Sequence, residues 1–399
     1  MVSRQKRIIW ILNHTTLMEW EVPLLIENGY EVFVPKILPA GPNGRTAKVT
    51  AEYDKYLTIE KTELEHLNTI NFYEKPIEYQ TADILNRNFA NCISAYIFPG
   101  LYYLLNSYNG KIFMRAFGHA GTMDYEKATS TVPNDDLVLQ NNLGLKKRMF
   151  QMVSKMINRL LNPAGIVHHN RIMDEMFRRR NDIFLAAAYQ EILDNENAFL
   201  KKRGLFMPLA IPPSIAHLSD KWSGGDNRIL FICPNIFQIN YYKEIYESFK
   251  KHLGMFPHCI AGRQDISGAK KETDWSDNNI LGYVSRVELN KLLCTCSCMF
   301  YHSQEPRHLH YHPLEAISAG MPLIFMSGGL LEKLGGANQP GLCRNYQEAK
   351  EKISSIINGN MSLIHEIKIQ QKRILDCFRP EFCESVWKKE FFPISAKVS

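Results

Sequence analysis

The sequence has 399 residues, of which 45% are hydrophobic and 22% are charged, and its formal net charge is +6. Because a single hydrophobic core stops growing at about 250–300 residues, a chain of this length is expected to form two domains. The composition is ordinary for a soluble globular protein, and no run approaches the roughly 18 apolar residues of a membrane helix. Residues 4–12 imitate a signal peptide, but their apolar run is too short and lacks a cleavage site, so they predict a buried strand.

The cysteines number nine and lack the regular spacing of a disulfide framework. Free thiols in a reducing compartment are therefore expected, which favours a cytoplasmic protein. Cys294, Cys296 and Cys298 alternate within a strand-like run, and this spacing differs from the CxxC pairs of zinc modules. We interpret these three residues as small buried residues of a strand.

The first half of the chain alternates strand and helix patterns. Residues 7–13 predict a strand, residues 17–28 an amphipathic helix, and residues 30–35 the next strand. Another strand is predicted to end within 94–100, and residues 111–121 are predicted to be a strand that runs into a glycine-punctuated loop. This β/α order is typical of a parallel sheet with helices on its faces.

Four polar residues follow predicted strands in this half. Asn13 and His14 lie on the loop after the first strand, where ligands bind in β/α domains, so we predict that they contact an acceptor. A helix cap on one of the two threonines that follow explains this polar turn equally well. Arg115 and His119 lie where a later strand meets its loop and are candidate catalytic residues. Their alternative role is to donate hydrogen bonds to loop carbonyl groups.

A basic segment occupies residues 146–180, with nine Lys or Arg residues and two acids. Its surplus of seven positive charges exceeds the +6 of the whole chain. Apolar residues recur within it at helical spacing, so a solvated basic face over a core-facing stripe is the first interpretation. The alternative is a surface for an anionic membrane or a phosphorylated acceptor. No recognition motif supports nucleic acid.

The strand and helix pattern restarts after a break in the middle of the chain. Pro212-Pro213 and the polar residues 219–227 form the best candidate linker, and a strand follows at 229–234. The predicted domains are an N-terminal one over 1–205, a linker over 206–228, and a C-terminal one over 229–378. A last helix within 379–399 is predicted to return to the N-terminal domain. The expected fold class is α/β.

The stretch Tyr301–Gly329 concentrates the chemistry of the second half. Its first fifteen residues hold four histidines, two acids and an arginine. A helix-like run at 314–319, a Gly-Met-Pro turn and a buried strand at 323–326 follow. This order places polar side chains and helix-end N–H groups beside the carboxyl ends of strands, where ligands bind in open α/β sheets.

This stretch resembles the donor domain of GT-B glycosyltransferases. The family segment Glu-Gly-Phe-Gly-x-Pro-x-x-Glu-Ala-x-Ala-x-Gly-x-Pro-Val-Ile is similar to residues 307–324 here. The Gly-Gly-x-x-Glu loop that follows in the family is matched by Gly328–Glu332, and its lone glycine by Gly341. The resemblance covers about a third of the chain and implies a GT-B fold, in which two Rossmann-like β/α/β domains face each other across a cleft.

The resemblance also implies roles for residues of the second domain. Glu315 stands at the family's second glutamate, which accepts hydrogen bonds from the donor ribose, although a helix-capping role is the alternative. Gly328 and Gly329 are predicted to bind the donor as well. The first glutamate of the family, which faces the sugar, is Arg307 here. This departure makes Arg307 a third candidate catalytic residue.

The family's usual Arg and Lys after the first strand of this domain are missing, so other cations must meet the donor phosphate. Those within reach of the predicted strand ends are Arg263, Arg307, His308, His310 and His312. The acid that serves as base or nucleophile is not determined by the sequence. Candidates near the N-terminal loops are Glu19, Glu21 and Asp124.

Two other interpretations concern the histidines. His312-Pro313 resembles the His-Pro pair of sialyl and Kdo transferases, which contacts the phosphate of a CMP-sugar, so a CMP-linked donor stays open. His308, His310 and His312 also have the alternating spacing of metal ligands, yet no acidic partner is evident in the sequence. GT-B enzymes generally need no metal, and no Asp-x-Asp motif is present. We therefore predict no metal and no cofactor besides the nucleotide-sugar.

These inferences predict a cytoplasmic, metal-independent and retaining glycosyltransferase. It is expected to transfer a sugar from a nucleotide-sugar to a glycan or lipid-linked acceptor in polysaccharide biosynthesis, with peripheral contact to an anionic membrane through 146–180 as an additional partner. A non-catalytic nucleotide-binding scaffold of the same fold is the rival from another function class. The sugar, linkage and acceptor do not follow from the sequence.

Overall fold

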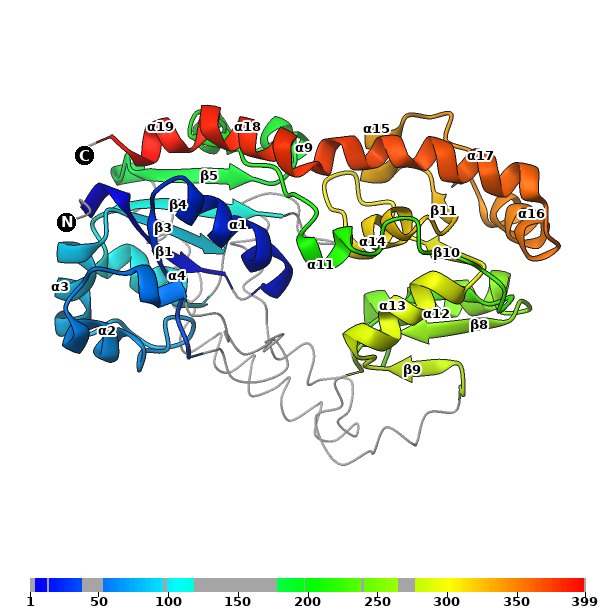
Figure 1. Ribbon diagram of the computed structural model, residues 1–399, viewed down its shortest axis with the longest axis horizontal. Helices are drawn as coiled ribbons and strands as arrows, with labels where there is room; N and C mark the ends of the chain where they lie inside the picture. Colours follow the sequence, from blue (N-terminus) through cyan, green and yellow to red (C-terminus); the bar gives the residue numbers. More distant parts are fainter. Residues whose placement is uncertain are drawn as a thin grey trace, which may run out of the picture. The chain divides into compact units, whose positions relative to one another are not determined.

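The computed structural model describes residues 4–12, 14–37, 53–95, 99–117, 178–196, 198–237, 240–264 and 277–397. The predictions made for Asn13, His119, Asp124 and residues 146–177 concern residues outside this part of the chain. The described residues form two compact units. One holds residues up to 117, residues 178–214 and those from Phe378 onwards, and the other holds residues 215–377. Each contains a six-stranded sheet (Figure 1).

The first unit is built on a parallel sheet in the order β2-β1-β3-β4-β5-β6. Its inner strand β1 reads Arg-Ile-Ile-Trp-Ile and is buried throughout, as expected for a parallel strand with both faces covered. The elements are β1 Arg7–Ile11, α1 Thr15–Glu27, β2 Glu31–Phe33, α2 Lys61–Leu67, α3 Tyr79–Asn88, β3 Asn91–Ala95, α4 Pro99–Ser107, β4 Lys111–Ala116, β5 Ile183–Ala187, α9 Gln190–Asn195, α10 Ala198–Lys201 and β6 Gly204–Phe206.

The C-terminal helices α18 (Pro380–Glu390) and α19 (Phe392–Ser395) belong to this first unit. Figure 1 shows them running along its sheet. The fully buried Trp387 donates a hydrogen bond from Nε1 to the carbonyl oxygen of Pro208 at 3.1 Å. Phe391 packs edge-on against Phe113 of β4, with ring centroids 4.7 Å apart. Apolar burial of these large aromatic side chains fixes the end of the chain on the sheet.

The second unit has a parallel sheet in the order β12-β11-β10-β7-β8-β9. When β7 is counted as the first strand and the sheet is read from β9 to β12, the order is 3-2-1-4-5-6, that of a Rossmann sheet. A short helix, α11 Pro213–Ala216, precedes it. The elements are β7 Ile229–Ile232, α12 Asn240–Leu253, β8 His258–Ala261, β9 Ile280–Gly282, α13 Arg286–Thr295, β10 Cys298–Tyr301, α14 Tyr311–Ala319, β11 Leu323–Met326, α15 Leu330–Gly335, β12 Leu342–Cys343, α16 Tyr346–Ile357 and α17 Met361–Gln371.

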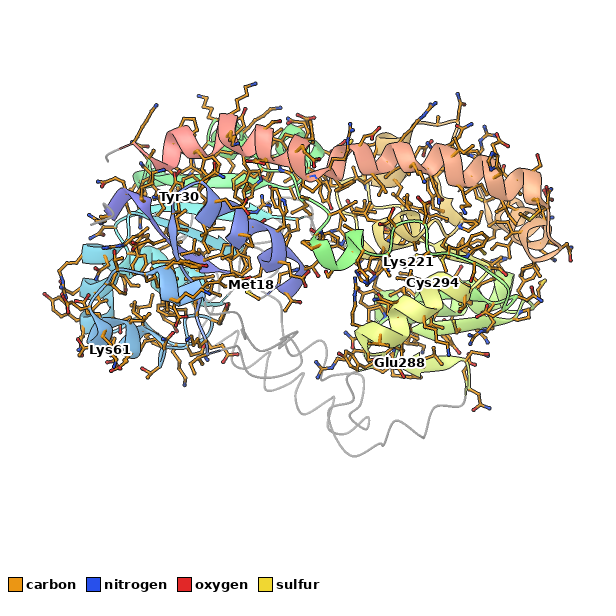
Figure 2. All side chains as sticks on the ribbon, viewed as in Figure 1. Met18, Tyr30, Lys61, Lys221, Glu288 and Cys294 are labelled. Carbon is orange, nitrogen blue, oxygen red and sulfur yellow. The ribbon has the colours of Figure 1, made fainter. Side chains whose placement is uncertain are left out.

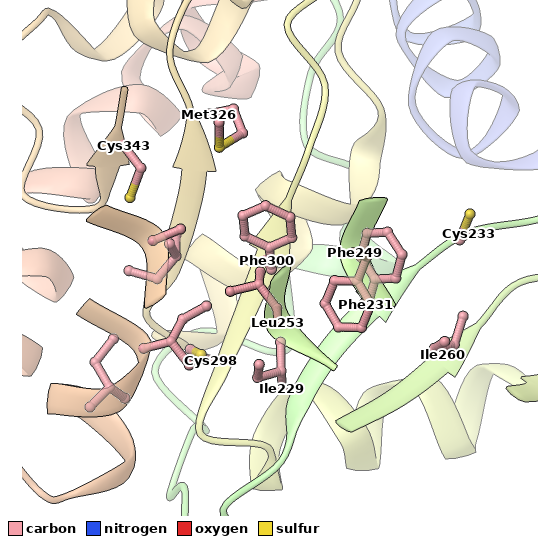
Figure 3. Close-up of a cluster of buried hydrophobic side chains, with 14 of the residues drawn as sticks. Ile229, Phe231, Cys233, Phe249, Leu253, Ile260, Cys298, Phe300, Met326 and Cys343 are labelled. Atoms are coloured by element: carbon pink, nitrogen blue, oxygen red, sulfur yellow. The ribbon is translucent and has the colours of Figure 1, made fainter. Parts of the chain in front are cut away.

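Aromatic rings and branched aliphatic side chains fill the core of the second unit (Figure 3). Phe231 of β7 and Phe249 of α12 stack with centroids 4.1 Å apart and an interplanar angle of 7°. Phe300 of β10 lies 6.1 Å from each of them. The sheet and the helix that covers it are thus joined by one aromatic cluster, which fixes the strand ends beside it.

Two predictions about local elements have different outcomes, and one of them is wrong. The wrong one is the interpretation of the cysteines; the strand predicted to end within 94–100 does end there, at Ala95, and helix α4 begins at Pro99. The cysteine run is not one strand: Cys294 lies in the last turn of α13, Cys296 caps that helix, and only Cys298 is in β10. The short spacing therefore reflects a helix-to-strand turn. All nine cysteines are free thiols.

Candidate functional site

The second sheet reverses its strand order between β7 and β10. Ligands of open α/β sheets bind outside the carboxyl ends of the strands at such a switch point. The loops there are residues 233–237 after β7 and residues 302–310 after β10. The rings of Phe231 and His302 lie 5.7 Å apart in an edge-on contact. The candidate site is therefore defined by these two loops and by the helix ends beside them.

Backbone hydrogen bonds hold the loops after β7 and β8 together. Asn235 has a left-handed φ of 52°, and its N–H donates to the carbonyl oxygen of Arg263 at 2.9 Å. The buried side chain of Gln264 accepts from Ile236 N at 2.8 Å and donates to Cys233 O at 2.9 Å. Arg263 is thereby presented at the end of β8 with an exposed side chain.

Three predicted donor-binding histidines gather where α14 begins. The His308 and His310 rings lie 4.4 Å apart edge-on, and the His310 and His312 rings lie 5.9 Å apart and are nearly parallel. The hydroxyl of Tyr301 is 3.1 Å from His310 Nδ1. A helix start carries partial positive charge, and imidazole N–H groups can donate to anionic oxygens. The cluster therefore suits a phosphate.

Arg307 lies in the same loop and is only 9% exposed. Its backbone N–H donates to Glu305 Oε1 at 3.3 Å, and its Nε is 3.8 Å from that oxygen. Burial raises the pKa of Glu305, although the nearby Arg307 and Lys333 oppose that rise. The charge of Arg307 is thus held close to a carboxylate of its own loop, and its catalytic role stays a prediction.

Glu315 lies in the second turn of α14 and is 4% exposed. Its Oε1 accepts a hydrogen bond from a terminal nitrogen of Arg286, at the start of α13, at 2.5 Å. Its Oε2 is 3.6 Å from His312 Nδ1, just beyond hydrogen-bond distance, and neither atom has a hydrogen-bond partner among the described residues. Burial alone raises the pKa of Glu315, but His312 and Arg286 outweigh it and keep that pKa below its usual range.

The incomplete hydrogen bonding at Glu315 is unusual because most buried polar atoms are paired. A ligand hydroxyl is one group that could complete it. Arg286 was not predicted from the sequence, since its contact with Glu315 spans 29 positions and depends on the packing of two helices. The capping box of Ser285 and Glu288 does mark the start of α13 (Glu288 is labelled in Figure 2), but not what its first residue contacts.

The glycine loop after β11 packs tightly against the loop after β10. A Cβ at Gly329 would lie 2.6 Å from the carbonyl oxygen of Ser303. Gly328 has a left-handed φ of 88° and donates its N–H to Glu332 Oε2 at 2.6 Å. Gln304 Nε2 donates to Ser327 O at 2.8 Å. Gly329 thus permits close approach of the two loops and Gly328 permits the left-handed turn, while their contact with a donor remains a prediction.

Arg115 does not face a ligand. It is fully buried, and its guanidinium contacts Glu21 Oε1 at 2.6 and 3.1 Å. It also donates to the carbonyl oxygens of Ala186 at 3.3 Å and Met207 at 2.6 Å. The alternative role, an arginine that satisfies carbonyl groups, is the one that the structure shows. Glu21 is equally enclosed, so neither residue is retained as a catalytic candidate.

The remaining predicted residues have mixed outcomes. His14 caps α1, because its Nδ1 accepts from Leu17 N at 3.3 Å; the cap is therefore His14 and not a threonine, and its acceptor contact stays a prediction. Arg180, at the end of the basic segment, pairs with Asp182 at 2.8 Å and donates to the carbonyl oxygens of three residues of the first unit. Arg180 thus stabilises the fold and does not belong to a free basic surface.

In the described part of the chain, no group of three or more His, Cys, Asp or Glu side chains is arranged to hold a metal ion. No helix within the same residues is long and apolar enough to cross a bilayer.

The sequence matches no protein-family model and no curated protein. Solved structures do match over nearly the whole length. A glycosyltransferase from Rickettsia africae has a TM-score of 0.55 at 11% identity, covering 97% of this chain and 98% of its own. HepE of Anabaena, in complex with UDP and glucose, has a TM-score of 0.57 at 11% identity, covering 96% and 98%. An alpha-glucosyltransferase in complex with UDP-glucose and DNA containing an abasic site has a TM-score of 0.54 at 14% identity, covering 98% and 99%.

These likenesses agree with the two parallel, six-stranded α/β sheets described above. The protein has the GT-B glycosyltransferase fold. At such low identity the comparison defines the fold, and the chemistry has to be argued from the site.

Proposed function

We propose that the protein is a glycosyltransferase that uses a nucleotide-sugar donor. The observation that carries this proposal is the position of the histidine cluster and Glu315. They lie after the strand at the switch point of the second sheet, in a GT-B fold whose solved neighbours include complexes with UDP and glucose and with UDP-glucose. UDP-sugars are therefore the first donors to test. The second unit is the proposed donor domain, and the first is the proposed acceptor domain.

The proposed reaction breaks the bond between the sugar C1 and the phosphate oxygen. The nucleotide leaves with the electron pair, the acceptor hydroxyl forms the new bond to C1, and its proton passes to a base. Negative charge builds on the leaving phosphate as the bond breaks. Cationic donors such as Arg263 and the imidazoles of His310 and His312 would contribute more in that transition state than in the ground state. The base is not assigned, and retention of configuration is proposed from the sequence resemblance alone.

The proposed acceptor is a glycan or a lipid-linked glycan of a bacterial-type surface polysaccharide, and the enzyme is proposed to need no metal. For the acceptor, support comes from the sequence of residues 146–180, which lie mostly outside the described residues. Their binding to anionic lipid can be tested with phosphatidylserine vesicles at rising salt, because surface charge attraction weakens with ionic strength. Arg180 should be left intact in such variants, since its loss would disturb the first unit.

Donor use can be tested without knowing the acceptor. Purified protein is incubated with UDP-glucose, UDP-galactose, UDP-N-acetylglucosamine and CMP-sialic acid, and both thermal stabilisation and release of free nucleotide are measured. Stabilisation and slow hydrolysis with a UDP-sugar are expected. Stabilisation without any hydrolysis, even with acceptor extracts, would favour the scaffold alternative. Repeating the assay with EDTA tests the proposed independence from metal.

A CMP-sugar donor is the second candidate, and a specific observation favours it. Three imidazoles, rather than the family's arginine and lysine, cluster at the start of α14. A CMP-sugar has one phosphate and needs fewer cations than a diphosphate donor. Release of CMP, with no release of UDP, in the same assay would select this candidate.

A further inference from the structure

Arg286 occupies a position that helix stability does not explain. It is the first residue of α13, whose start is fixed by the capping box of Ser285 and Glu288. A cation at a helix N-terminus opposes the helix dipole. Its side chain is 40% exposed, yet its guanidinium reaches Glu315 Oε1 at 2.5 Å on the neighbouring helix. The contact with Glu315 therefore accounts for an arginine at this place.

Glu315 depends on that contact. Its side chain is 5% exposed, and the strands β10 and β11 beside α14 carry no charged residue, nor does α11. Two groups hold the pKa of Glu315 below its usual range against the effect of burial: His312 on its own helix and Arg286 on α13. Of the two, Arg286 is the one in direct contact with a carboxylate oxygen, at 2.5 Å.

We propose that Arg286 is a positioning residue of the donor site. It occupies Oε1 of Glu315 and leaves Oε2 as the oxygen that accepts a donor hydroxyl. This inference rests on the proposed function, in which Glu315 binds the donor ribose. It adds a residue outside the matched stretch, and it specifies which of the two carboxylate oxygens takes the ligand.

The test compares donor affinity between pH 5 and 8 by calorimetry, with UDP-glucose or whichever nucleotide-sugar the donor screen selects. In the wild type Glu315 stays ionised over this range, because its pKa is held low. In Arg286→Gln, burial is opposed by His312 alone, so the pKa of Glu315 rises. Donor affinity should fall on the order of tenfold at neutral pH, and further as the pH falls. The double variant Arg286→Gln/Glu315→Gln should lack this additional pH dependence.

Two further variants separate positioning from general damage. Arg286→Lys retains the charge and should recover part of the affinity, with little added pH dependence. Arg228→Gln is the matched control. Arg228 pairs with Asp226 at 2.8 Å and its side chain is 39% exposed, but it directly precedes β7 and so lies at the amino ends of the strands, opposite the candidate site. It should bind donor normally. If Arg286→Gln does not fold, the lysine variant carries the affinity comparison: it should bind donor more weakly than the wild type does, and unchanged affinity would overturn the inference.

The outcomes are distinguishable. If the wild type binds no nucleotide-sugar, the proposed function fails. If the wild type binds donor while folded Arg286→Gln shows the same affinity and pH profile, the inference about Arg286 fails and the proposed function stands. A third outcome would also overturn the inference about Arg286. If the double variant Arg286→Gln/Glu315→Gln shows the same added pH dependence of donor affinity as Arg286→Gln, then Arg286 acts without Glu315.

Discussion

Two arginine–glutamate pairs lie in the two units of this protein, and they differ in how fully their hydrogen bonds are made. In the first unit, Arg115 and Glu21 have side chains that are both 0% exposed. Glu21 Oε2 accepts from Trp10 Nε1 at 3.0 Å, and the remaining arginine donors reach carbonyl oxygens. The network is closed on itself and joins α1, three strands of the sheet (β1, β4 and β5) and the segment after β6.

In the second unit, the side chains of Arg286 and Glu315 are 40% and 5% exposed, and Glu315 Oε2 has no hydrogen-bond partner among the described residues, with His312 Nδ1 3.6 Å away. The same two residue types therefore serve different ends. A buried network with every member paired stabilises the core and has no capacity left for a ligand. A buried carboxylate with an unpaired oxygen at the switch point of a sheet retains that capacity. Between these two pairs, completeness of hydrogen bonding is the difference that bears on ligand binding.

The largest expected effect is at the closed pair. Arg115→Met should lower the free energy of unfolding by about 3–5 kcal/mol, because it leaves the Glu21 carboxylate buried and unpaired. Urea unfolding of the purified variant measures this. The double substitution Arg115→Met/Glu21→Leu should recover much of the loss. Unchanged stability in the single variant would contradict the view that this pair belongs to the core.

The same residue shows what the sequence could not reveal. Arg115 was interpreted as facing a ligand because it ends a strand, where ligands bind. Its partner lies 94 positions away on α1, and a contact at that separation leaves no local pattern. The strands themselves were predictable, since Lys111–Ala116 and its neighbours are short apolar runs between polar turns. Local patterns gave the elements, and tertiary packing decided which polar side chains are enclosed.

Another buried polar atom without a hydrogen-bond partner lies at the same switch point, and it provides a test of stability against pH. His302 Nδ1 has no hydrogen-bond partner among the described residues, and burial lowers the pKa of His302 to about 4. The unfolded chain, with an ordinary histidine pKa of about 6.5, binds the proton first. Stability should therefore fall as the pH drops from about 6.5 to 4, by at most about 3 kcal/mol. Below that window the loss is complete.

The measurement is urea unfolding of the wild type and His302→Leu at several pH values. The variant should lose less stability between pH 6.5 and 4 than the wild type does. His365→Gln, on the exposed face of α17, is the matched control and should follow the wild type. Parallel curves for all three proteins would show that His302 does not titrate in the way its surroundings indicate.

Substitutions at the candidate donor site should change ligand binding. His312→Ala and Arg263→Ala are each expected to weaken binding of the nucleotide-sugar by about 1.5–3 kcal/mol, because charge-assisted hydrogen bonds to phosphate are lost. Binding of the bare nucleoside should change little. Calorimetry with both ligands checks this. Equal losses for nucleotide-sugar and nucleoside would assign these residues to base binding or to folding.

The smallest effect on the free energy of unfolding is expected at an exposed ion pair, in contrast to the buried pair of Arg115 and Glu21. Lys243 and Glu247 on α12 are 3.8 Å apart and 59% and 60% exposed. Such a pair contributes about 0.3–0.5 kcal/mol because water and salt screen it, so Lys243→Ala should hardly change the urea midpoint. A loss of several kcal/mol here would show that the proximity of charges alone, without burial, predicts stability in this protein.

Much of the candidate site could also be located from the sequence. The order of loop, helix, Gly-Met-Pro turn and strand in residues 301–329 follows from local patterns, and α14 begins only a few residues earlier than its apolar run. The clustering of His308, His310 and His312 follows from their alternate spacing before the helix. What could not be predicted is Arg286, because its contact requires two helices to pack. That Glu315 Oε2 lacks a hydrogen-bond partner could not be predicted either, because it depends on the same packing of helices.

The account rests most on Glu315 as the residue that binds the donor ribose. The decisive measurement is calorimetric binding of the nucleotide-sugar and of its 2′-deoxy analogue to the wild type and to Glu315→Gln, with Glu366→Gln on the exposed face of α17 as control. A direct contact predicts that Glu315→Gln weakens binding of the full donor by about ten- to a hundredfold. The deoxy analogue should bind the wild type poorly and lose much less on mutation, because contacting groups are not additive. Independent, additive losses would contradict this assignment.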